Sequence, residues 1–316
     1  MPEPKTVLLF PGQGSQRVGM GADLCKASEK ARKVYDKADE LLGFPISKLS
    51  FEGPEEELKK TINTQPAILV HSAACLEMLG DSDLSAGGAA GHSLGEYTAL
   101  IAAGALSFED ALLLVRKRGE LMYKSGERRA GTMAALLGAT LEQAGELCEG
   151  ASGAGAVVPA NINSPGQIVV SGDTAAVGKV VEVAGRFPGV KAIPLVVSGA
   201  FHSPLMEEPA AEFAEHVRNV EVREARFPVV ANVSGAPVTW AEEIREALIK
   251  QLTAAVRWED SMRWFLSHEY GPFIEIGPGK VLTGMMRRID RKAAALATDT
   301  LEGLEKVLSR APQPQK

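Results

Sequence analysis

The sequence has little cysteine, no excess of basic residues and no long apolar run. Its three cysteines, Cys25, Cys75 and Cys148, are widely spaced and have no metal-ligand partners beside them. This pattern favours buried, reduced thiols in a reducing compartment over disulfides or a metal site. The formal net charge of −6 disfavours general nucleic-acid binding, because that function needs a basic face.

The apolar run at 7–10 is too short for a signal-peptide core or a membrane span, and no later run reaches spanning length. We therefore expect a cytoplasmic protein that does not enter membranes. With 45% hydrophobic and 23% charged residues the composition is that of a globular protein. The length of 316 residues exceeds that of a usual single core, so either an insertion or a second domain is expected.

Residues 131–198 carry the alternation expected of an inserted unit. Strand-like and helical segments follow one another in the order β-α-β-β-α-β, at 132–137, 141–148, 156–161, 167–171, 175–186 and 190–197. This order is typical of the ferredoxin-like unit. The sequence thus predicts an α/β body formed by residues 1–130 and 199–316, and a ferredoxin-like insert at 131–198.

The remaining segments alternate strands and helices, as an α/β fold requires. Strands are expected at 7–10, 86–90, 229–233 and 273–276, and the principal helices at 29–42, 55–60, 66–79, 108–123, 204–217 and 241–252. The segment 86–90 consists of small residues with poor strand propensity. It is assigned as a strand only because the motif that follows requires one.

That motif is Gly91-His92-Ser93-Leu94-Gly95. A Gly-x-Ser-x-Gly sequence is typical of a sharp strand-to-helix turn, a nucleophile elbow, which lifts a serine hydroxyl clear of the backbone. Ser93 is therefore the candidate nucleophile, and the helix after it would direct main-chain N–H groups at an anion beside it.

A serine needs a base, and His202 is the best placed of five histidines. It follows a predicted strand and precedes Ser203-Pro204, which is a helix-start signal. Open α/β sheets place their sites at such strand ends. His92 should point away from Ser93 through the turn, and the others, His71, His216 and His268, lie in helical patterns that favour structural roles.

Arg118 lies on the apolar stripe of the predicted helix 108–123. An inward guanidinium keeps its charge and needs an anion, and its planar fork suits a carboxylate. The anion could be an internal Asp or Glu, or a substrate. In contrast, Gly277-Pro278-Gly279-Lys280 lacks the spacing of a phosphate-binding loop and predicts a tight turn.

Five blocks together resemble the malonyl-CoA:acyl-carrier-protein transacylase family. They are Pro11-Gly12-Gln13-Gly14-Ser15-Gln16, the elbow with Glu96, Arg118-Gly119, Gly199-Ala200-Phe201-His202-Ser203 and Gln251-Leu252. The resemblance extends from about residue 7 to residue 304. It implies an α/β-hydrolase-like large subdomain with an inserted ferredoxin-like small subdomain, in agreement with the pattern above.

The resemblance also implies roles. Ser93 would attack the malonyl thioester with His202 as base and then acid, the main-chain amides of Gln13 and Leu94 would hold the oxyanion, and Arg118 would bind the malonyl carboxylate. The main-chain carbonyl of Gln251 would orient His202 in place of a triad aspartate. Asn161 matches a family position near the acyl group, and Phe201 one that leaves little room for a 2-methyl branch.

The implied reaction is ping-pong transfer of malonyl from coenzyme A to the phosphopantetheine thiol of acyl carrier protein, for fatty-acid elongation. No cofactor or metal is implied beyond the coenzyme A thioester. Because the family's carrier protein is acidic, the basic run Arg287, Arg288, Arg291 and Lys292 is a candidate docking surface, although a solvated helix face would look the same.

Two other functions fit part of the pattern. A serine hydrolase shares the elbow but wants its histidine near the C-terminus, where only His268 is available, and it has no need of an inward arginine. A non-catalytic carrier-protein-binding relative would share the fold without turnover.

Overall fold

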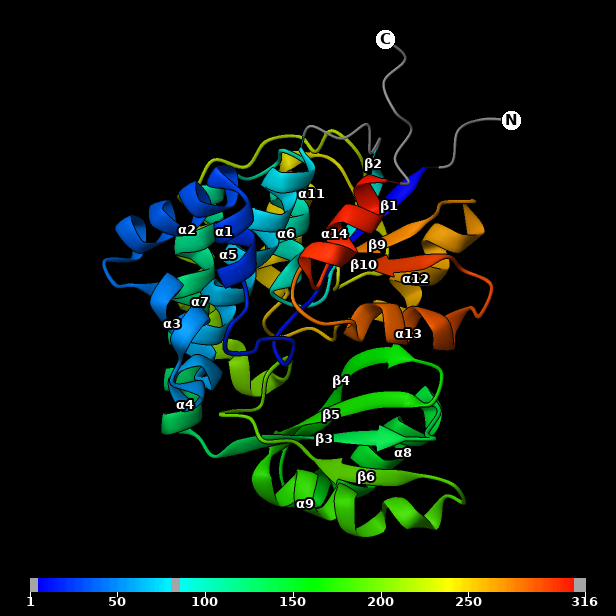
Figure 1. The fold of residues 1–316 in the computed structure, drawn as a ribbon. Helices are drawn as coiled ribbons and strands as arrows, with labels where there is room; N and C mark the ends of the chain where they lie inside the picture. The colour runs from blue at the N-terminus through cyan, green and yellow to red at the C-terminus, as the bar shows by residue number, and fades with distance from the viewer. Residues whose placement is uncertain (1–4, 81–85, 310–316) are drawn as a thin grey trace.

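The computed structural model describes residues 5–80 and 86–309. Two β-sheets are present in this part of the chain (Figure 1). The larger has six strands in the order β10-β9-β1-β2-β7-β8, and all neighbours are parallel except β7 and β8. Its strands are β1 (Thr6–Phe10), β2 (Ala86–Gly91), β7 (Val229–Val230), β8 (Pro237–Val238), β9 (Phe273–Glu275) and β10 (Ala295–Ala297).

The smaller sheet has four antiparallel strands in the order β4-β5-β3-β6. They are β3 (Gly131–Leu137), β4 (Val157–Ser164), β5 (Gln167–Asp173) and β6 (Lys191–Pro194), with α8 (Leu141–Ala151) and α9 (Thr174–Val183) between them in the chain. This is the strand order of the ferredoxin-like unit. The predicted fold class, an α/β-hydrolase-like body with a ferredoxin-like insert, is confirmed.

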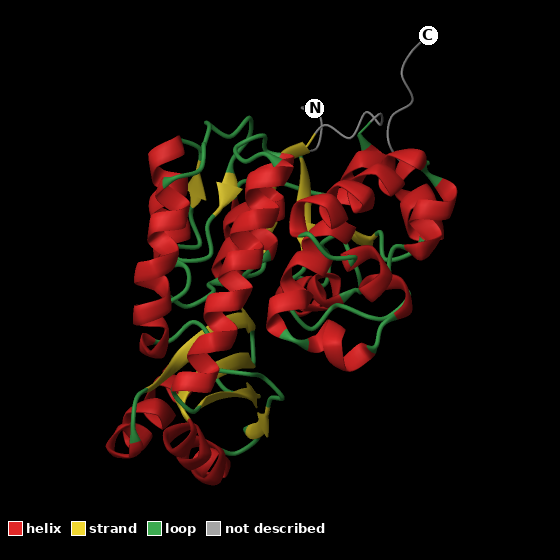
Figure 2. Ribbon diagram, turned by 90° about the vertical axis from the view of Figure 1, so that its left-hand side faces the viewer, coloured by secondary structure: helices red, strands yellow, loops and turns green. Residues whose placement is uncertain are grey.

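Helices cover both faces of the larger sheet, and α8 and α9 cover the outer face of the smaller one (Figure 2). The remaining α-helices are α1 (Ala22–Ala27), α2 (Glu29–Leu42), α3 (Ile46–Glu52), α4 (Glu55–Lys59), α5 (Thr61–Leu79), α6 (Gly95–Ala102), α7 (Phe108–Arg128), α10 (Glu207–Arg218), α11 (Ala241–Lys250), α12 (Trp258–Ser267), α13 (Val281–Ile289) and α14 (Leu301–Leu308). Among the described residues, no helix combines the length and the apolar character needed to cross a membrane.

The core explains why a strand of small residues forms β2. This strand lies between β1 and β7 in the sheet, and Ala89 and Ala90 are fully buried. A side chain at Gly88 would collide with the Phe265 ring, at 2.6 Å. Close packing on both faces of the sheet therefore requires small residues in β2, and this requirement outweighs their low strand propensity.

Several predicted bounds were wrong, among them those of α5, β6 and β7. Helix α5 begins at Thr61 rather than at residue 66, so Pro66 lies inside it. The strand predicted at 190–197 is ordered as β6 only over Lys191–Pro194, and the one predicted at 229–233 only as Val229–Val230. In each strand the apolar run continues beyond the residues that have a pairing partner. The three cysteines are buried and free, as predicted.

A short β-bridge joins the small sheet to the segment between α11 and α12 of the body. Asn161 of β4 pairs in parallel with Val256, with hydrogen bonds from Ile162 N to Val256 O and from Val256 N to Ala160 O, both 2.8 Å. In Figure 1 the small sheet lies below the carboxyl ends of β1 and β2. The loops after β1, β2, β7 and β9 meet at this edge, where open α/β sheets place their sites.

Candidate active site

Close packing at two glycines shapes the turn between β2 and α6. A Cβ on Gly91 would lie 1.8 Å from the Gly95 carbonyl carbon, and one on Gly95 would lie 2.1 Å from the Phe10 carbonyl oxygen. Ser93 has a φ of 52°, a left-handed conformation that is strained for a residue with a side chain. These features are those of a nucleophile elbow, as the motif predicts.

Ser93 and His202 are in contact. The distance between Ser93 Oγ and His202 Nε2 is 2.8 Å. His202 lies after β6 and just before Ser203, whose hydroxyl accepts the Leu205 N–H at the start of a 3-10 helix (Pro204–Met206). Its own φ is 57°. Two strained residues from distant parts of the chain are therefore held face to face.

The other ring nitrogen of His202 is held by main-chain carbonyls. Nδ1 lies 2.9 Å from Gln251 O and 3.2 Å from Ala254 O, so it carries the proton and leaves Nε2 free to accept one. Burial, together with the nearby Arg118 charge, lowers the pKa of His202 to about 3. The imidazole is therefore neutral near pH 7, as a general base must be.

Arg118 is buried, with 1% of its surface exposed. Its Nη1 donates to Gln65 Oε1 at 2.7 Å, and its Nη2 donates to Ser93 Oγ at 2.9 Å and to Gln251 Oε1 at 3.1 Å. Among residues 5–80 and 86–309, no carboxylate lies within ion-pair distance of it. Of the two anions considered from the sequence, an internal carboxylate in direct contact with Arg118 is thus absent from the described residues.

The loop Pro11–Gln16 packs directly against the elbow. A Cβ on Gly12 would lie 2.6 Å from the His92 carbonyl oxygen. Neither the Gln13 nor the Leu94 main-chain N–H donates to an acceptor in the described part of the chain. The Gln13 side chain donates to Thr61 Oγ1 at 3.1 Å, and Thr61 Oγ1 lies 3.1 Å from Ser198 Oγ.

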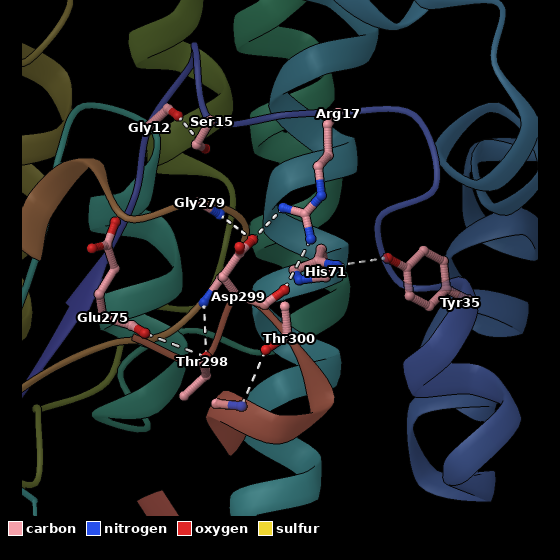
Figure 3. A network of polar contacts seen from close by, with 12 residues as sticks. Gly12, Ser15, Arg17, Tyr35, His71, Glu275, Gly279, Thr298, Asp299 and Thr300 are labelled. Carbon is pink, nitrogen blue, oxygen red and sulfur yellow. Dashed lines mark hydrogen bonds and ion pairs between the residues drawn. The ribbon is translucent and has the colours of Figure 1, made fainter. Parts of the chain in front are cut away.

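An ion pair ties this loop to the C-terminal part of the body (Figure 3). Arg17 pairs with the Asp299 carboxylate, and its Nη2 donates to the Asp299 main-chain oxygen at 3.0 Å. Asp299 Oδ1 also accepts the Gly279 N–H at 2.6 Å. The loop after β1 and the turn after β9 are thus held by one carboxylate. Gly277–Lys280 forms a turn, as its sequence predicts.

The two weaker candidates lie close to the dyad. Asn161 is 6% exposed and pairs with Val256, two residues beyond the Ala254 carbonyl that His202 approaches. Phe201, also 6% exposed, is the neighbour of His202 in the chain. No hydrogen bond joins the Asn161 side chain to Ser93 or Arg118 among the described residues.

The basic run lies at and just after α13. Arg287, Arg288, Arg291 and Lys292 are exposed, and none forms an ion pair with another described residue. Arg288 Nη1 donates to Gln167 Oε1 at 3.0 Å, which links α13 to β5.

Three other histidines have separate partners. His92 Nε2 lies 2.8 Å from Asn163 Oδ1, so its ring points away from Ser93, as predicted. His71 is buried and lies 3.3 Å from the Tyr35 hydroxyl (Figure 3). His268 is exposed at the end of α12, with Nδ1 2.8 Å from Trp264 O. The histidine that a serine hydrolase would need is thus paired elsewhere.

Three polar side chains around the dyad were not found from the sequence. Asn232 Oδ1 accepts the Ser93 N–H at 2.7 Å, Gln251 Nε2 donates to Glu96 Oε2 at 2.6 Å, and Gln65 Oε1 accepts from Arg118. Asn232 lies within the strand predicted at 229–233, and Glu96 is a charge inside an apolar helix. Glu96 belongs to the elbow block, but the sequence analysis assigned neither residue a role.

Comparison with known proteins agrees with this geometry. The acyl transferase domain family matches residues 7–307. The malonyl CoA-acyl carrier protein transacylase of Bacillus subtilis (strain 168) is 44% identical over 302 residues, which cover 95% of each chain. That of Staphylococcus aureus (strain MW2) is 42% identical and covers 95% of this chain and 97% of its own.

Solved structures agree equally well. The crystal structure of malonyl-CoA:acyl carrier protein transacylase from Xanthomonas oryzae pv. oryzae has a TM-score of 0.94 at 38% identity, covering 99% of this chain and 100% of its own. A type II PKS acyl-carrier protein in complex with its malonyl-transacylase gives a TM-score of 0.92 at 37% identity, covering 96% and 99%. The chain therefore belongs to the acyl transferase domain family, in the group of malonyl-CoA:acyl-carrier-protein transacylases.

Proposed function

We propose that this protein transfers malonyl groups from coenzyme A to the phosphopantetheine thiol of acyl carrier protein and so supplies fatty-acid elongation in the cytoplasm. The observation that carries the proposal is the buried Arg118, which touches Ser93 Oγ and has no carboxylate within ion-pair distance among the described residues. A nucleophile beside an unpaired, desolvated cation suits a substrate that brings its own carboxylate.

In the first half-reaction Ser93 Oγ attacks the malonyl thioester carbonyl while His202 Nε2 takes the hydroxyl proton. The 2.8 Å contact between the two atoms supports this transfer. The tetrahedral intermediate collapses, the carbon–sulfur bond breaks, and His202 returns the proton to the departing coenzyme A sulfur. A malonyl ester on Ser93 and free coenzyme A remain.

The second half-reaction reverses these steps with a new thiol. The phosphopantetheine sulfhydryl gives its proton to His202 Nε2 and attacks the ester carbonyl, and Ser93 Oγ then leaves and recovers the proton. The carbonyls of Gln251 and Ala254 keep the imidazole in the tautomer that both halves need. Because main-chain carbonyls occupy the place of a triad acid at His202 Nδ1, Ser93 and His202 would act as a dyad.

The main-chain N–H groups of Gln13 and Leu94 would bind the oxyanion in both halves. Their lack of an acceptor among the described residues supports this role, and so does the position of Leu94 next to Ser93 at the start of α6. Preorganised amides of this kind can each lower the activation barrier by about 3–4 kcal/mol.

Arg118 would bind the malonyl carboxylate and hold the acyl group in line with Ser93. Water would then compete poorly, because the bound ester is shielded and the incoming thiol is positioned. Asn161 and Phe201 would line the acyl pocket, where the Phe201 ring would oppose a 2-methyl branch. Both side chains are buried, and Phe201 is the neighbour of His202 in the chain.

The docking surface for acyl carrier protein would be the basic run at α13. Its four side chains are exposed and free of ion pairs with the described residues, so they are available to an acidic partner. Complementary charge of this kind mainly raises the association rate, and the effect weakens with salt.

A direct test is mass spectrometry after brief exposure of the protein to malonyl-CoA. A mass increase of one malonyl group on the peptide that contains Ser93, lost on addition of phosphopantetheinylated carrier protein, is the expected result. The matched control is Ser267→Ala, which removes an exposed hydroxyl that donates to Trp264 O at the end of α12. Absence of an adduct in the unaltered protein would leave only a carrier-binding role.

A further inference from the structure

Glu96 is a buried acid that the proposed chemistry leaves unused. It is the second residue of α6, follows the elbow directly and is 2% exposed. Burying a carboxyl group is costly unless hydrogen bonds hold it. Burial here raises the pKa of Glu96 to about 7, even though hydrogen bonds to Gln251 and Asn232 and the Arg118 charge oppose the rise. An acid retained at such a position calls for an explanation.

The hydrogen bonds of Glu96 lead to the dyad. Its Oε2 accepts from Gln251 Nε2 at 2.6 Å and from the Asn232 main-chain N–H at 3.3 Å. Because Oε2 faces two N–H donors, it acts as an acceptor whether or not the other oxygen carries a proton. The stronger of the two bonds, judged by length, is the one to Gln251.

Gln251 contacts Ser93, Arg118 and His202. Its Nε2 also donates to Ser93 O at 3.0 Å, its Oε1 accepts from Arg118 Nη2 at 3.1 Å, and its main-chain oxygen accepts from His202 Nδ1 at 2.9 Å. The residue is fully buried. Its side-chain amide therefore lies between the nucleophile and the cation that would bind the malonyl carboxylate.

A primary amide can be rotated by half a turn with little change of shape, and only its partners decide between the two orientations. In the observed orientation Nε2 faces Glu96 and Oε1 faces Arg118. The reverse would place two oxygens against each other at Glu96 and two sets of N–H groups against each other at Arg118. Glu96 therefore selects the orientation in which Gln251 holds the guanidinium.

We propose that Glu96 is a positioning residue for malonyl selectivity: by fixing the Gln251 amide it holds Arg118 where the malonyl carboxylate binds. The inference rests on the proposed function. Acetyl transfer lacks the carboxylate, so it depends on Arg118 only through the hydrogen bond to Ser93 Oγ, which both substrates share. The malonyl-to-acetyl ratio of kcat/KM thus separates positioning of Arg118 from a general effect on folding or on the dyad.

The test uses Glu96→Gln, which keeps the size but allows its amide and that of Gln251 to turn together. We expect the malonyl-to-acetyl ratio of kcat/KM to fall about 10-fold or more, with acetyl transfer changed less than about threefold. Glu275→Gln is the matched control. Glu275 is fully buried and accepts from Leu282 N at 3.0 Å and Thr283 N at 2.7 Å. The Glu275→Gln substitution should lower Tm and leave the malonyl-to-acetyl ratio of kcat/KM unchanged.

Gln251→Met supplies the second variant. It removes the amide, keeps the main-chain carbonyl that meets His202, and should lower the same ratio. In the double variant the loss should not exceed that of the larger single loss, because Glu96 acts through Gln251. An unchanged ratio in Glu96→Gln, or losses that multiply in the double variant, would overturn the inference. If Glu96→Gln does not fold, an unchanged ratio in Gln251→Met overturns it instead.

Failure of the proposed function would look different. An unaltered protein that forms no malonyl ester on Ser93, or that shows no preference for malonyl over acetyl, contradicts the proposed function itself. An unaltered protein that prefers malonyl, together with a Glu96→Gln variant that prefers it equally, contradicts only the role of Glu96.

Discussion

Asn232 holds the strained backbone of Ser93 in place. Its Oδ1 accepts the Ser93 N–H at 2.7 Å, and its Nδ2 donates to the Gly91 carbonyl at 2.7 Å. The side chain is 1% exposed, so water does not compete for these groups. One amide thus bridges the end of β2 and Ser93, and it satisfies a main-chain N–H that would otherwise be unpaired at the elbow.

Replacement of Asn232 by Ala should therefore slow acylation. The elbow would lose two buried hydrogen bonds, at about 1–3 kcal/mol for each unsatisfied group. We expect kcat for malonyl transfer to fall about 10-fold or more while KM for malonyl-CoA changes less than about threefold, measured in steady state with Tm recorded in parallel. Asn219→Ala, at the exposed end of α10, is the control. A normal acylation rate in Asn232→Ala would contradict this role.

Arg118→Ala should abolish the preference for malonyl. A charge-assisted pair between a buried guanidinium and a substrate carboxylate is worth roughly 2–5 kcal/mol, so kcat/KM for malonyl-CoA should fall by about 30- to 5,000-fold. Acetyl transfer should be unchanged or faster, because that substrate brings no carboxylate. Lys117→Ala is the control on the same helix, where Lys117 pairs with Glu212. An equal loss of kcat/KM with both substrates would argue against binding of the malonyl carboxylate by Arg118.

The pH dependence of stability should carry the signature of His202. Burial and the Arg118 charge lower its pKa to about 3 from an ordinary value near 6.5. Between these values the folded protein binds fewer protons than the unfolded chain, so the free energy of unfolding rises with pH across this window and falls as pH drops below 6.5. Lowering the pH from 7 to 5 should cost about 2 kcal/mol through His202 alone.

Urea unfolding of the unaltered protein and of His202→Gln at pH 5 and pH 7 checks this. The unaltered protein should lose more stability than the variant on going to pH 5. Equal losses would mean that His202 is not held neutral. Glu96 acts with the opposite sign, because its raised pKa makes the folded protein bind more protons between about 4.5 and 7. It is present in both proteins, so the comparison isolates His202.

The elbow and the ferredoxin-like insert could be predicted because their signals are local. The glycines at 91 and 95 form a recognisable five-residue motif around Ser93, and the β-α-β-β-α-β order follows from consecutive segments. His202 could be found for the same reason, since it lies between a strand and a helix start. The sequence signals of these features depend little on contacts with distant parts of the chain.

Other features depend on partners distant in the sequence. β8 has two residues and β10 three, so each is a strand only because a neighbour pairs with it. Helix α5 runs through Pro66, against the usual reading of proline as a helix boundary. Asn232 and Glu96 acquire their roles only when β7, α6 and the Gln251 turn meet. Isolated polar residues of this kind belong to no sequence pattern from which their roles could be predicted.

Charge reversal tests the docking surface. Arg287→Glu with Arg291→Glu leaves the Arg288 bond to Gln167 in place. KM for acyl carrier protein should rise about 5-fold or more at low salt, with a smaller effect at high salt, while acylation by malonyl-CoA stays within about twofold. Arg218→Glu with Arg223→Glu makes the same change of net charge elsewhere, at exposed arginines that pair with Glu215 and Glu221. An unchanged KM would remove α13 as the docking site.

The Arg17–Asp299 pair should matter for the oxyanion loop more than for substrate binding. Asp299 holds Arg17, which follows the loop of Gln13, and also the Gly279 N–H (Figure 3). In Asp299→Ala the loop loses this anchor, and the Gln13 amide becomes less well placed for the intermediate. The anchor combines a partly exposed ion pair with a charge-assisted hydrogen bond, so a loss of about 1–1.5 kcal/mol is expected.

That loss corresponds to a kcat about 5- to 13-fold lower, with KM for malonyl-CoA changed less than about twofold. Glu29→Ala, which breaks the exposed Lys33 pair on α2, is the matched control and should change neither constant. A rise in KM without a change in kcat would instead assign the pair to substrate binding. Because the loop and the Gly279 turn come from opposite ends of the chain, an effect on kcat would tie the site's geometry to the C-terminal strand and helix.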